Sequence, residues 1–256
     1  MDAKVFERDL IQARLLSAIF SRSVKNQVVL KGGMAFRALF GSQRYTKDID
    51  LAQASAQPLA ALQRLMRQSI DACVQGFLVD VVVTEPKQTD TTARWKIHGK
   101  TAGGTEIGLT VEVSRCGIPD GHIESRFFRP PEDARCANVK IDVFDQDALA
   151  VSKVFALASP NRLAPRDLYD LDLLVQMEVR PPAEMFAAVS DRRALVAEVW
   201  AKIDSMSWAH FECEVIPFLP DAMRSRIDAE EFEAMRVRVG EAVENWLATD
   251  GGPSCE

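Results

Sequence analysis

Residues 31–51 constrain the fold more than any other part of the chain, and they read KGGMAFRALFGSQRYTKDIDL. The glycine pair Gly32 and Gly33 follows an apolar run and precedes MAFRALF, which predicts a short strand, a tight turn and a helix. The run DIDLA then alternates polar and apolar residues, which predicts a second strand. A core that mixes helices and strands is therefore expected here.

The predicted strand DIDLA carries two acidic residues with the spacing of one strand face. Side chains at positions i and i+2 of a strand point the same way, so Asp48 and Asp50 share a face while Ile49 and Leu51 face the core. Paired carboxylates are ligands that Mg²⁺ prefers, and they suit a metal bound to nucleotide phosphates. The glycine turn before a helix also favours an approaching phosphate. A structural turn and two solvated acids would give the same pattern.

A third carboxylate from a neighbouring strand would complete a metal site, and two candidates exist. In GLTVEVS, Glu112 lies on a polar face at mid-strand, whereas in FLVDVVV, Asp80 is surrounded by apolar residues. Glu112 is preferred for this reason. It could equally mark the solvent face of an edge strand.

The pattern of apolar residues along the rest of the chain predicts further helices and strands, and a second, helical domain toward the C-terminus. Helices are expected over 5–22, 58–72, 145–159, 166–178, 183–205 and 228–248, and strands over 77–83, 95–100, 107–114 and 138–144. Gly103 and Gly104 predict a hairpin turn between two of these strands. The segment 117–136 is rich in Pro, Gly and charge, so a boundary is expected within 120–137, which separates a core over 1–125 from a helical domain over 126–256.

Composition argues against several classes of protein. The 256 residues carry a net charge of −6, which disfavours coating of nucleic acid by bulk charge, although a basic stretch that includes Arg14, Arg37 and Arg44 precedes Asp48. No apolar run is long enough to span a membrane, so we expect a cytoplasmic protein without a membrane partner. The five cysteines are scattered without C-x-x-C spacing, which indicates neither a disulfide framework nor a zinc site.

These motifs together resemble the AbiEii/AbiGii family of nucleotidyltransferase toxins, within the DNA polymerase beta-like nucleotidyltransferase superfamily. KGGMAFRALFGSQRYTKDIDL resembles the first motif of that family, TVEVS its third-carboxylate strand, and KVFALASPNRLAPRDLYDLDLL its C-terminal motifs. The likeness covers approximately residues 5–178. Met34 and Thr46 depart from the commoner Thr and Ser, and Glu112 from the Asp of several relatives. The implied fold class is α+β, with a polymerase-beta-like core containing a mixed sheet and a C-terminal helical domain, and the active site between them.

The resemblance also implies roles for individual residues. It implies catalytic roles for Lys153, Asp167 and Asp170 in addition to the three carboxylates, and a Mg²⁺ site made by Asp48, Asp50 and Glu112. It implies nucleotide binding by Gly32, Gly33, Arg44, Thr46, Lys153 and Arg166. Without the resemblance, Asp167 and Asp170 fit surface ion pairs at a helix start equally well.

The expected activity is Mg²⁺-dependent transfer of NMP from an NTP to the 3′ end of tRNA or another RNA. The chain would then be the toxin of a toxin–antitoxin pair, with a cognate antitoxin as its protein partner. Two alternatives remain from the sequence: nucleotidyl transfer to a protein side chain, and a non-catalytic nucleotide-binding or partner-binding module on the same fold.

Overall fold

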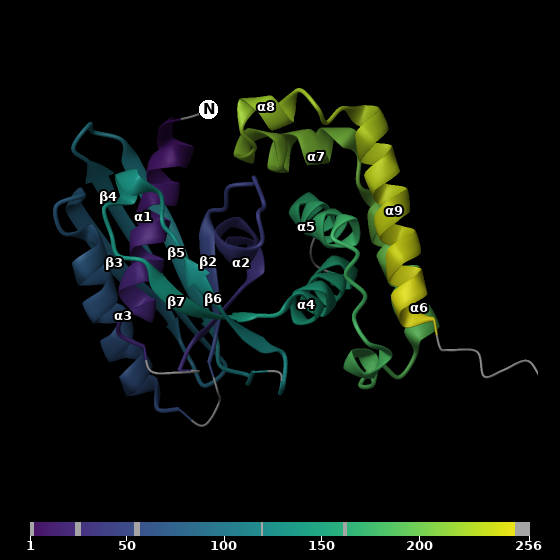
Figure 1. Ribbon diagram of the computed structural model, residues 1–256, viewed down its shortest axis with the longest axis horizontal. Helices are drawn as coiled ribbons and strands as arrows, with labels where there is room; N and C mark the ends of the chain where they lie inside the picture. Colours follow the sequence, from purple (N-terminus) through teal and green to yellow (C-terminus); the bar gives the residue numbers. More distant parts are fainter. Residues whose placement is uncertain (1–2, 24–26, 54–56, 119, 161–162, 249–256) are drawn as a thin grey trace, which may run out of the picture. The chain divides into compact units, whose positions relative to one another are not determined.

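The chain folds into two compact units, Met1–Phe144 and Asp145–Glu256. A computed structural model describes residues 3–23, 27–53, 57–118, 120–160 and 163–248. The first unit contains a sheet covered by helices, and the second is helical (Figure 1). Within the described ranges, no helix is both long and apolar enough to cross a membrane.

The first unit alternates helices and strands before it becomes largely β. Its elements are α1 (Ala3–Phe20), β1 (Val29–Lys31), α2 (Gly32–Leu39), β2 (Asp48–Ala52), α3 (Leu59–Val74), β3 (Leu78–Gln88), β4 (Thr92–Thr101), β5 (Glu106–Ser114), β6 (Ile123–Phe128), the 3₁₀ helix η1 (Glu132–Ala134) and β7 (Val139–Phe144). The predicted hairpin is confirmed, because β4 and β5 pair antiparallel on either side of Gly103 and Gly104.

Seven strands form one mixed sheet in the order β3-β4-β5-β2-β1-β7-β6. The pairs β2–β5 and β1–β7 are parallel, and the other neighbours are antiparallel. The sequence predicted a mixed sheet, and that prediction is confirmed. Strand β2, which carries the two aspartates, pairs with β5 on one side and with β1 on the other, so it lies in the interior of the sheet.

The apolar side of the sheet packs against helices. Strand β5 buries every second residue, including Val111 and Val113, which are fully buried, and β4 buries Trp95 and Ile97 in the same way. Helix α1 contacts β5 and β7 and also packs against α3, with Leu15 and Leu16 fully buried. Burial of alternate strand residues leaves the intervening residues of β4 and β5 on the opposite, polar face.

The division between the units comes after the predicted range of 120–137. Strand β6 lies within a segment that was expected to be irregular, and it pairs with β7, which in turn pairs with β1. Both strands therefore belong to the sheet, and the first unit extends to Phe144 rather than to residue 125. β6 is a short edge strand with Glu124 and Arg126 in its middle, so its sequence lacks the apolar alternation of a buried strand.

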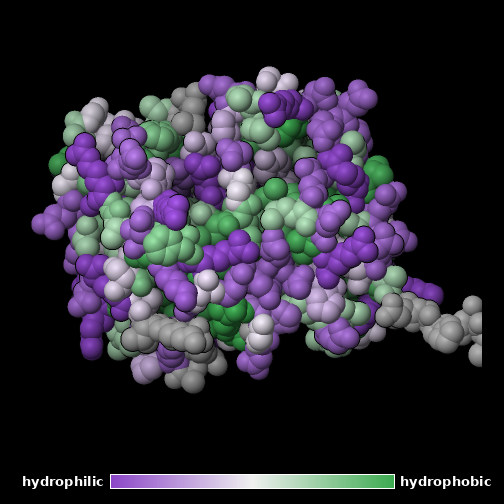
Figure 2. All heavy atoms as spheres, in the orientation of Figure 1, coloured by the Kyte–Doolittle hydropathy of each residue, from purple (hydrophilic) through white to green (hydrophobic). Residues whose placement is uncertain are grey.

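The second unit consists of helices. They are α4 (Gln146–Ala158), α5 (Pro165–Gln176), the 3₁₀ helix η2 (Ala183–Phe186), α6 (Arg192–Ser205), α7 (Trp208–Glu214), the 3₁₀ helix η3 (Ile216–Phe218), α8 (Asp221–Arg224) and α9 (Ala229–Leu247). The predicted continuous helix over 183–205 is wrong, because the side chain of Asp191 accepts a hydrogen bond from the Ala194 amide and starts a new helix. Figure 2 shows many hydrophilic residues along the outer edge of the visible face, as expected for helices and strands whose apolar sides pack inward.

Candidate active site

Strand β2 presents its two aspartates on one face. Asp48 and Asp50 are partly exposed, whereas Ile49 and Leu51 between and after them are fully buried. The predicted orientation of the strand is therefore confirmed. Two carboxylates remain accessible on the face opposite the core.

Glu112 lies directly beside Asp50. In the parallel pairing of β2 with β5, Asp50 is opposite Glu112 and Asp48 is opposite Thr110. Asp80 lies on β3, which β4 and β5 separate from β2, and its exposed carboxylate pairs with Lys100 at 3.6 Å. Of the two candidates for a third carboxylate, only Glu112 neighbours the aspartates.

The start of helix α2 contacts Asp50. Gly32, the first residue of α2, has φ +67°, and Lys31 before it is opposite Asp50 in the pairing of β1 with β2. A Cβ atom added to Gly32 would lie 2.9 Å from Asp50 Cβ and 3.0 Å from its Cγ. Both the backbone conformation and the space beside Asp50 therefore require glycine at this position.

Gly33, Arg44 and Thr46 also meet at this helix start. A Cβ on Gly33 would lie 3.0 Å from Arg44 Nη2 and 3.2 Å from Thr46 Oγ1. Arg44 is buried and donates a hydrogen bond from Nη1 to the carbonyl of Tyr45, while the Thr46 hydroxyl lies 3.3 Å from the carbonyl oxygen of Asp48. The residues predicted to bind nucleotide in this unit therefore surround the first turn of α2, where the leading backbone amides have no partner within the helix.

A partly buried ion pair fixes α2 against α1. Arg37 donates two hydrogen bonds to the carboxylate of Asp9, at 2.9 and 3.1 Å. Burial disfavours the charged guanidinium, but the hydrogen bond and charge of Asp9 outweigh this effect and raise the pKa of Arg37 above its ordinary value. Arg37 thus remains charged, and the pair holds the helix whose first turn faces Asp50.

Arg94 is the site residue that the sequence analysis missed. From β4, its Nε donates to the Glu112 carboxylate at 2.7 Å, and its Nη2 forms an ion pair with the same oxygen. Among the described residues, no group of three His, Cys, Asp or Glu side chains is placed to hold a metal ion. The predicted hairpin at Gly103 and Gly104 could have identified Arg94 from the sequence. Pairing β4 and β5 outward from that turn puts Arg94 opposite Glu112.

The second unit contains a buried cluster of Lys153, Asp167 and Asp170. Lys153 Nζ on α4 lies 2.6 Å from Asp167 Oδ1 and 2.7 Å from Asp170 Oδ2, both on α5. The side chains are 10%, 1% and 0% exposed, so the surface ion pairs that the sequence also allowed are excluded. Arg166 points elsewhere and lies 3.7 Å from Glu214 on α7.

Comparison with known proteins gives one matching family. The model of a family described as nucleotidyl transferase AbiEii toxin, type IV toxin–antitoxin system, matches residues 14–250. A search of curated proteins gave no match.

Solved structures share the fold at low sequence identity. MenT4, a nucleotidyltransferase toxin from Mycobacterium tuberculosis, is 20% identical with a TM-score of 0.59, covering 96% of this chain and 94% of MenT4. JHP933 from Helicobacter pylori is 14% identical with a TM-score of 0.57, over 96% and 93% of the two chains. A structure described as a nucleotidyltransferase from H. pylori is 14% identical with a TM-score of 0.56, over 96% of both chains.

Proposed function

The chain belongs to the AbiEii family of nucleotidyl transferase toxins, and we propose that it transfers NMP from an NTP to the 3′ end of tRNA or another RNA. The observation that carries this proposal is the pairing of Asp50 with Glu112 beside the glycine start of α2. A phosphate-binding helix start and adjacent carboxylates are the two parts that a nucleotidyl transfer requires. The bond from the acceptor oxygen to the α-phosphorus forms, the bond to the β-phosphate breaks, and pyrophosphate leaves.

The first turn of α2 would bind the triphosphate. Its leading amide groups have no partners within the helix, and the glycines at positions 32 and 33 allow a phosphate to approach the backbone closely. Arg44 and Thr46 border the same turn and add a guanidinium and a hydroxyl to the donor set. A triphosphate bound there would have its α-phosphate toward the face that bears Asp48 and Asp50.

The carboxylates of β2 fit a hard divalent cation such as Mg²⁺. Asp48 and Asp50 share one accessible face next to the helix start, and oxygen ligands of this kind suit that ion. When bound, Mg²⁺ would neutralise charge on the phosphates as the α–β bond breaks. Glu112 adds a third donor through its Oε1, because Arg94 binds the other oxygen, Oε2.

Glu112 would receive the proton of the acceptor hydroxyl. It neighbours Asp50 on β5, so a hydroxyl positioned for attack at the α-phosphate would come within its reach. Arg94 holds the carboxylate in place from the adjacent strand. Positioning and electrostatics supply most of the catalysis in reactions of this type.

For the second unit, we propose that Lys153 contributes to phosphate binding, as the family motif implies. Asp167 and Asp170 would then hold the ammonium group in place, as their distances of 2.6 and 2.7 Å support. A lysine provides a compact charge with three donors, which suits a phosphate group.

The toxin family also supports a cognate antitoxin as the protein partner, and we place the activity in the cytoplasm, where NTPs and RNA are available. The alternatives are transfer to a protein side chain and nucleotide binding without catalysis. Retention of Asp48, Asp50, Glu112 and Lys153 argues against the second of these.

A transfer assay decides between these functions. The protein is incubated with Mg²⁺ and each radiolabelled NTP in turn, together with total RNA or with cell lysate. Label in RNA that disappears with Asp50→Asn supports the proposal, whereas label in protein supports the first alternative. Nucleotide binding without label in either polymer would overturn the transferase assignment.

A further inference from the structure

One face of β4 carries a row of basic side chains that leads to the candidate active site. Alternate residues of the strand point away from the core, and they are Arg94, Lys96, His98 and Lys100. Arg94 is half-buried against Glu112, and the other three are exposed. Neighbours in such a row are spaced about 7 Å apart, which is comparable to the distance between successive phosphates of an extended nucleic acid strand.

At the level of Asp50 and Glu112, the side chains across the sheet change from acidic on β2 and β5 to basic on β4 and β3. The register places Asp50 opposite Glu112, Glu112 opposite Arg94, and Arg94 opposite Lys87 of the edge strand β3. Within the part of the chain that the structure describes, Lys87 and Lys96 form no ion pair or hydrogen bond through their side chains. Two cations next to the carboxylates are thus available to a ligand.

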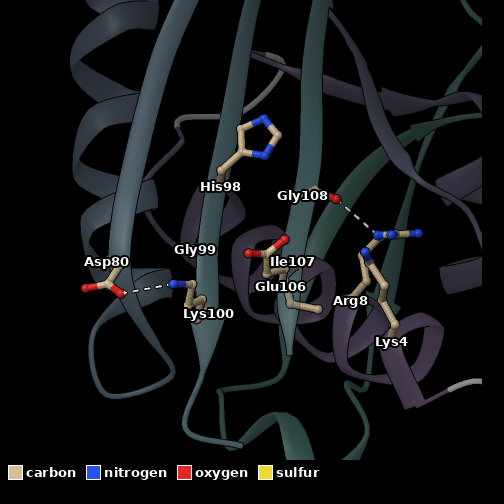
Figure 3. A pocket seen from close by; sticks show the side chains of 9 residues that line it. All are labelled: Lys4, Arg8, Asp80, His98, Gly99, Lys100, Glu106, Ile107 and Gly108. Atoms are coloured by element: carbon tan, nitrogen blue, oxygen red, sulfur yellow. Dashed lines mark hydrogen bonds and ion pairs between the residues drawn. The ribbon is translucent and has the colours of Figure 1, made fainter. Parts of the chain in front are cut away.

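The row ends in a pocket of about 380 Å³. Figure 3 shows Lys4 and Arg8 reaching it from α1, with His98, Lys100 and Glu106 contributed by β4 and β5. Arg8 donates from Nε to the carbonyl of Gly108 at 3.0 Å. A Cβ on Gly108 would lie 3.1 Å from His98 Nδ1, so the imidazole lies against the backbone of Gly108 and presents an aromatic ring beside the pocket.

We propose that the RNA acceptor of the proposed transfer lies along this face of β4. Its terminal nucleotide is at Arg94 and Glu112, its phosphates contact Lys96 and Lys87, and a preceding nucleotide enters the pocket beside His98. The inference rests on the proposed function, which requires the end of the RNA to lie at the carboxylates. The surface itself consists of described residues of β3 and β4. His98 lies about 14 Å along the strand from Arg94, since each residue advances about 3.4 Å. Imidazole rings and cations of this kind bind unpaired bases and the phosphates between them.

Charge favours RNA over a protein as the occupant. The four outward residues of β4 include no acid, and the carboxylates near the pocket, Asp80 and Glu106, are accompanied by Lys4, Arg8 and Lys100. Asp80 is already paired with Lys100. A cationic row beside a site for nucleotide chemistry suits a polyanion whose end must reach that site.

Three arginines of the basic stretch before Asp48 make contacts inside the first unit instead of forming such a row. Arg14 donates to the carbonyls of Cys73 and Ala134, Arg37 binds Asp9, and Arg44 is buried. These arginines therefore hold elements of the first unit together. The net charge of −6 also makes a local row, rather than the whole surface, the place where RNA would bind.

The test compares two double charge reversals in the full chain. Lys87→Glu/Lys96→Glu changes the proposed surface, and Arg64→Glu/Arg67→Glu changes two exposed arginines of α3 by the same charge. Binding of a fluorescein-labelled single-stranded RNA and of unlabelled NTP is measured for each protein over a range of salt concentrations. Thermal melting of each variant verifies folding, and Lys87→Gln/Lys96→Gln replaces the first pair if the reversal unfolds the protein.

The proposal predicts that Lys87→Glu/Lys96→Glu weakens RNA binding at least about tenfold. It also predicts that the slope of log affinity against log salt concentration falls by about 1.4, from about 0.7 for each contact to a phosphate of single-stranded RNA. NTP affinity should remain unchanged, and the α3 variant should bind RNA like wild type. Equal RNA affinity in all proteins, or no RNA binding by wild type, would overturn the proposal. Retained RNA affinity with loss of binding to a protein partner would assign the face to that partner instead.

These outcomes separate the surface from the reaction. If Lys87→Glu/Lys96→Glu loses RNA affinity but wild type transfers no label from any NTP, the surface stands and the transferase assignment fails. If wild type labels RNA while the variant binds and labels it equally well, the reaction stands and the surface is wrong.

Discussion

Asp50 and Glu112 are partners in the parallel pairing of β2 with β5, so two carboxylates from strands about 60 residues apart in sequence lie side by side on one sheet face. The glycine start of α2 touches the first of them, and Arg94 binds the second. This relationship joins a helix start suited to phosphate, acidic ligands and a basic strand within one unit.

Replacing either aspartate of β2 with asparagine should abolish nucleotidyl transfer without destabilising the fold. Both side chains are partly exposed, and two neighbouring carboxylates repel each other without a cation, so the melting temperature of Asp48→Asn or Asp50→Asn should equal or exceed that of wild type. Transfer of label from NTP and metal-free thermal melting provide the measurements. A clear loss of melting temperature would indicate a structural role instead.

A paired substitution tests the third carboxylate. Glu112→Gln should reduce transfer by orders of magnitude, while stability falls by less than about 1 kcal/mol, because the ion pair with Arg94 is more than one-third exposed. Asp80→Asn should leave both properties almost unchanged, since that carboxylate is 71% exposed on an edge strand. Initial rates and urea unfolding measure the two effects. Loss of activity in Asp80→Asn with an active Glu112→Gln would refute this assignment.

Local patterns in the sequence predicted most elements of the site. Alternation in DIDLA and GLTVEVS correctly predicted which residues face the core, and the glycine pair correctly predicted a turn into a helix. Such features depend on neighbours in sequence, which set the period of a strand and the start of a helix. The existence and orientation of β2 and β5 were therefore predictable.

Long-range pairing and burial were not predictable in the same way. Nothing in the sequence of β2 determines that it pairs with β5 rather than with another strand, because register depends on the packing of the whole sheet. The spacing of charged residues in this part of the sequence also fitted surface ion pairs. In the structure, the charge of Lys153 is instead balanced by Asp167 and Asp170 inside the second unit. Strand β6 escaped prediction because its charged residues at an edge hide the apolar alternation.

Lys153→Ala should destabilise the protein by about 3–5 kcal/mol, because removing the cation leaves two buried carboxylates without it. Loss of activity in this variant alone would therefore be ambiguous. Lys153→Arg keeps the charge and should recover much of the stability, while transfer stays low because a planar guanidinium does not replace a compact ammonium group. Urea unfolding and transfer rates are compared for the three proteins. An alanine variant as stable as wild type would contradict the buried cluster.

The cysteines should differ in reactivity with alkylating agents in the folded protein. Burial raises the pKa of the Cys73 thiol to about 12 from its ordinary value of 9.0, and burial also raises the pKa of Cys136, whereas Cys116 and Cys213 are exposed. At pH 8, iodoacetamide followed by peptide mass spectrometry should find Cys116 and Cys213 modified well before Cys73. Between pH 9 and 12, stability should fall as pH rises, because the unfolded thiol releases its proton first. Early labelling of Cys73 would show that α1 and α3 separate readily.

Gly32→Ala should inactivate the protein through Asp50. The glycine has φ +67°, which a residue with a Cβ adopts at a cost of about 1 kcal/mol or more, and that Cβ would lie 2.9 Å from Asp50 Cβ. The aspartate or the first turn of α2 must therefore move, and a displacement of about 1 Å at a reacting centre can lower the rate about 100-fold. Gly41→Ala is the matched control, because Gly41 has φ +77° but no atom within 4 Å of its added Cβ. Both variants should lose similar backbone stability in thermal melting, while only Gly32→Ala should lose nucleotidyl transfer and NTP affinity. If the two variants transfer label equally well, the contact between α2 and Asp50 does not serve the reaction.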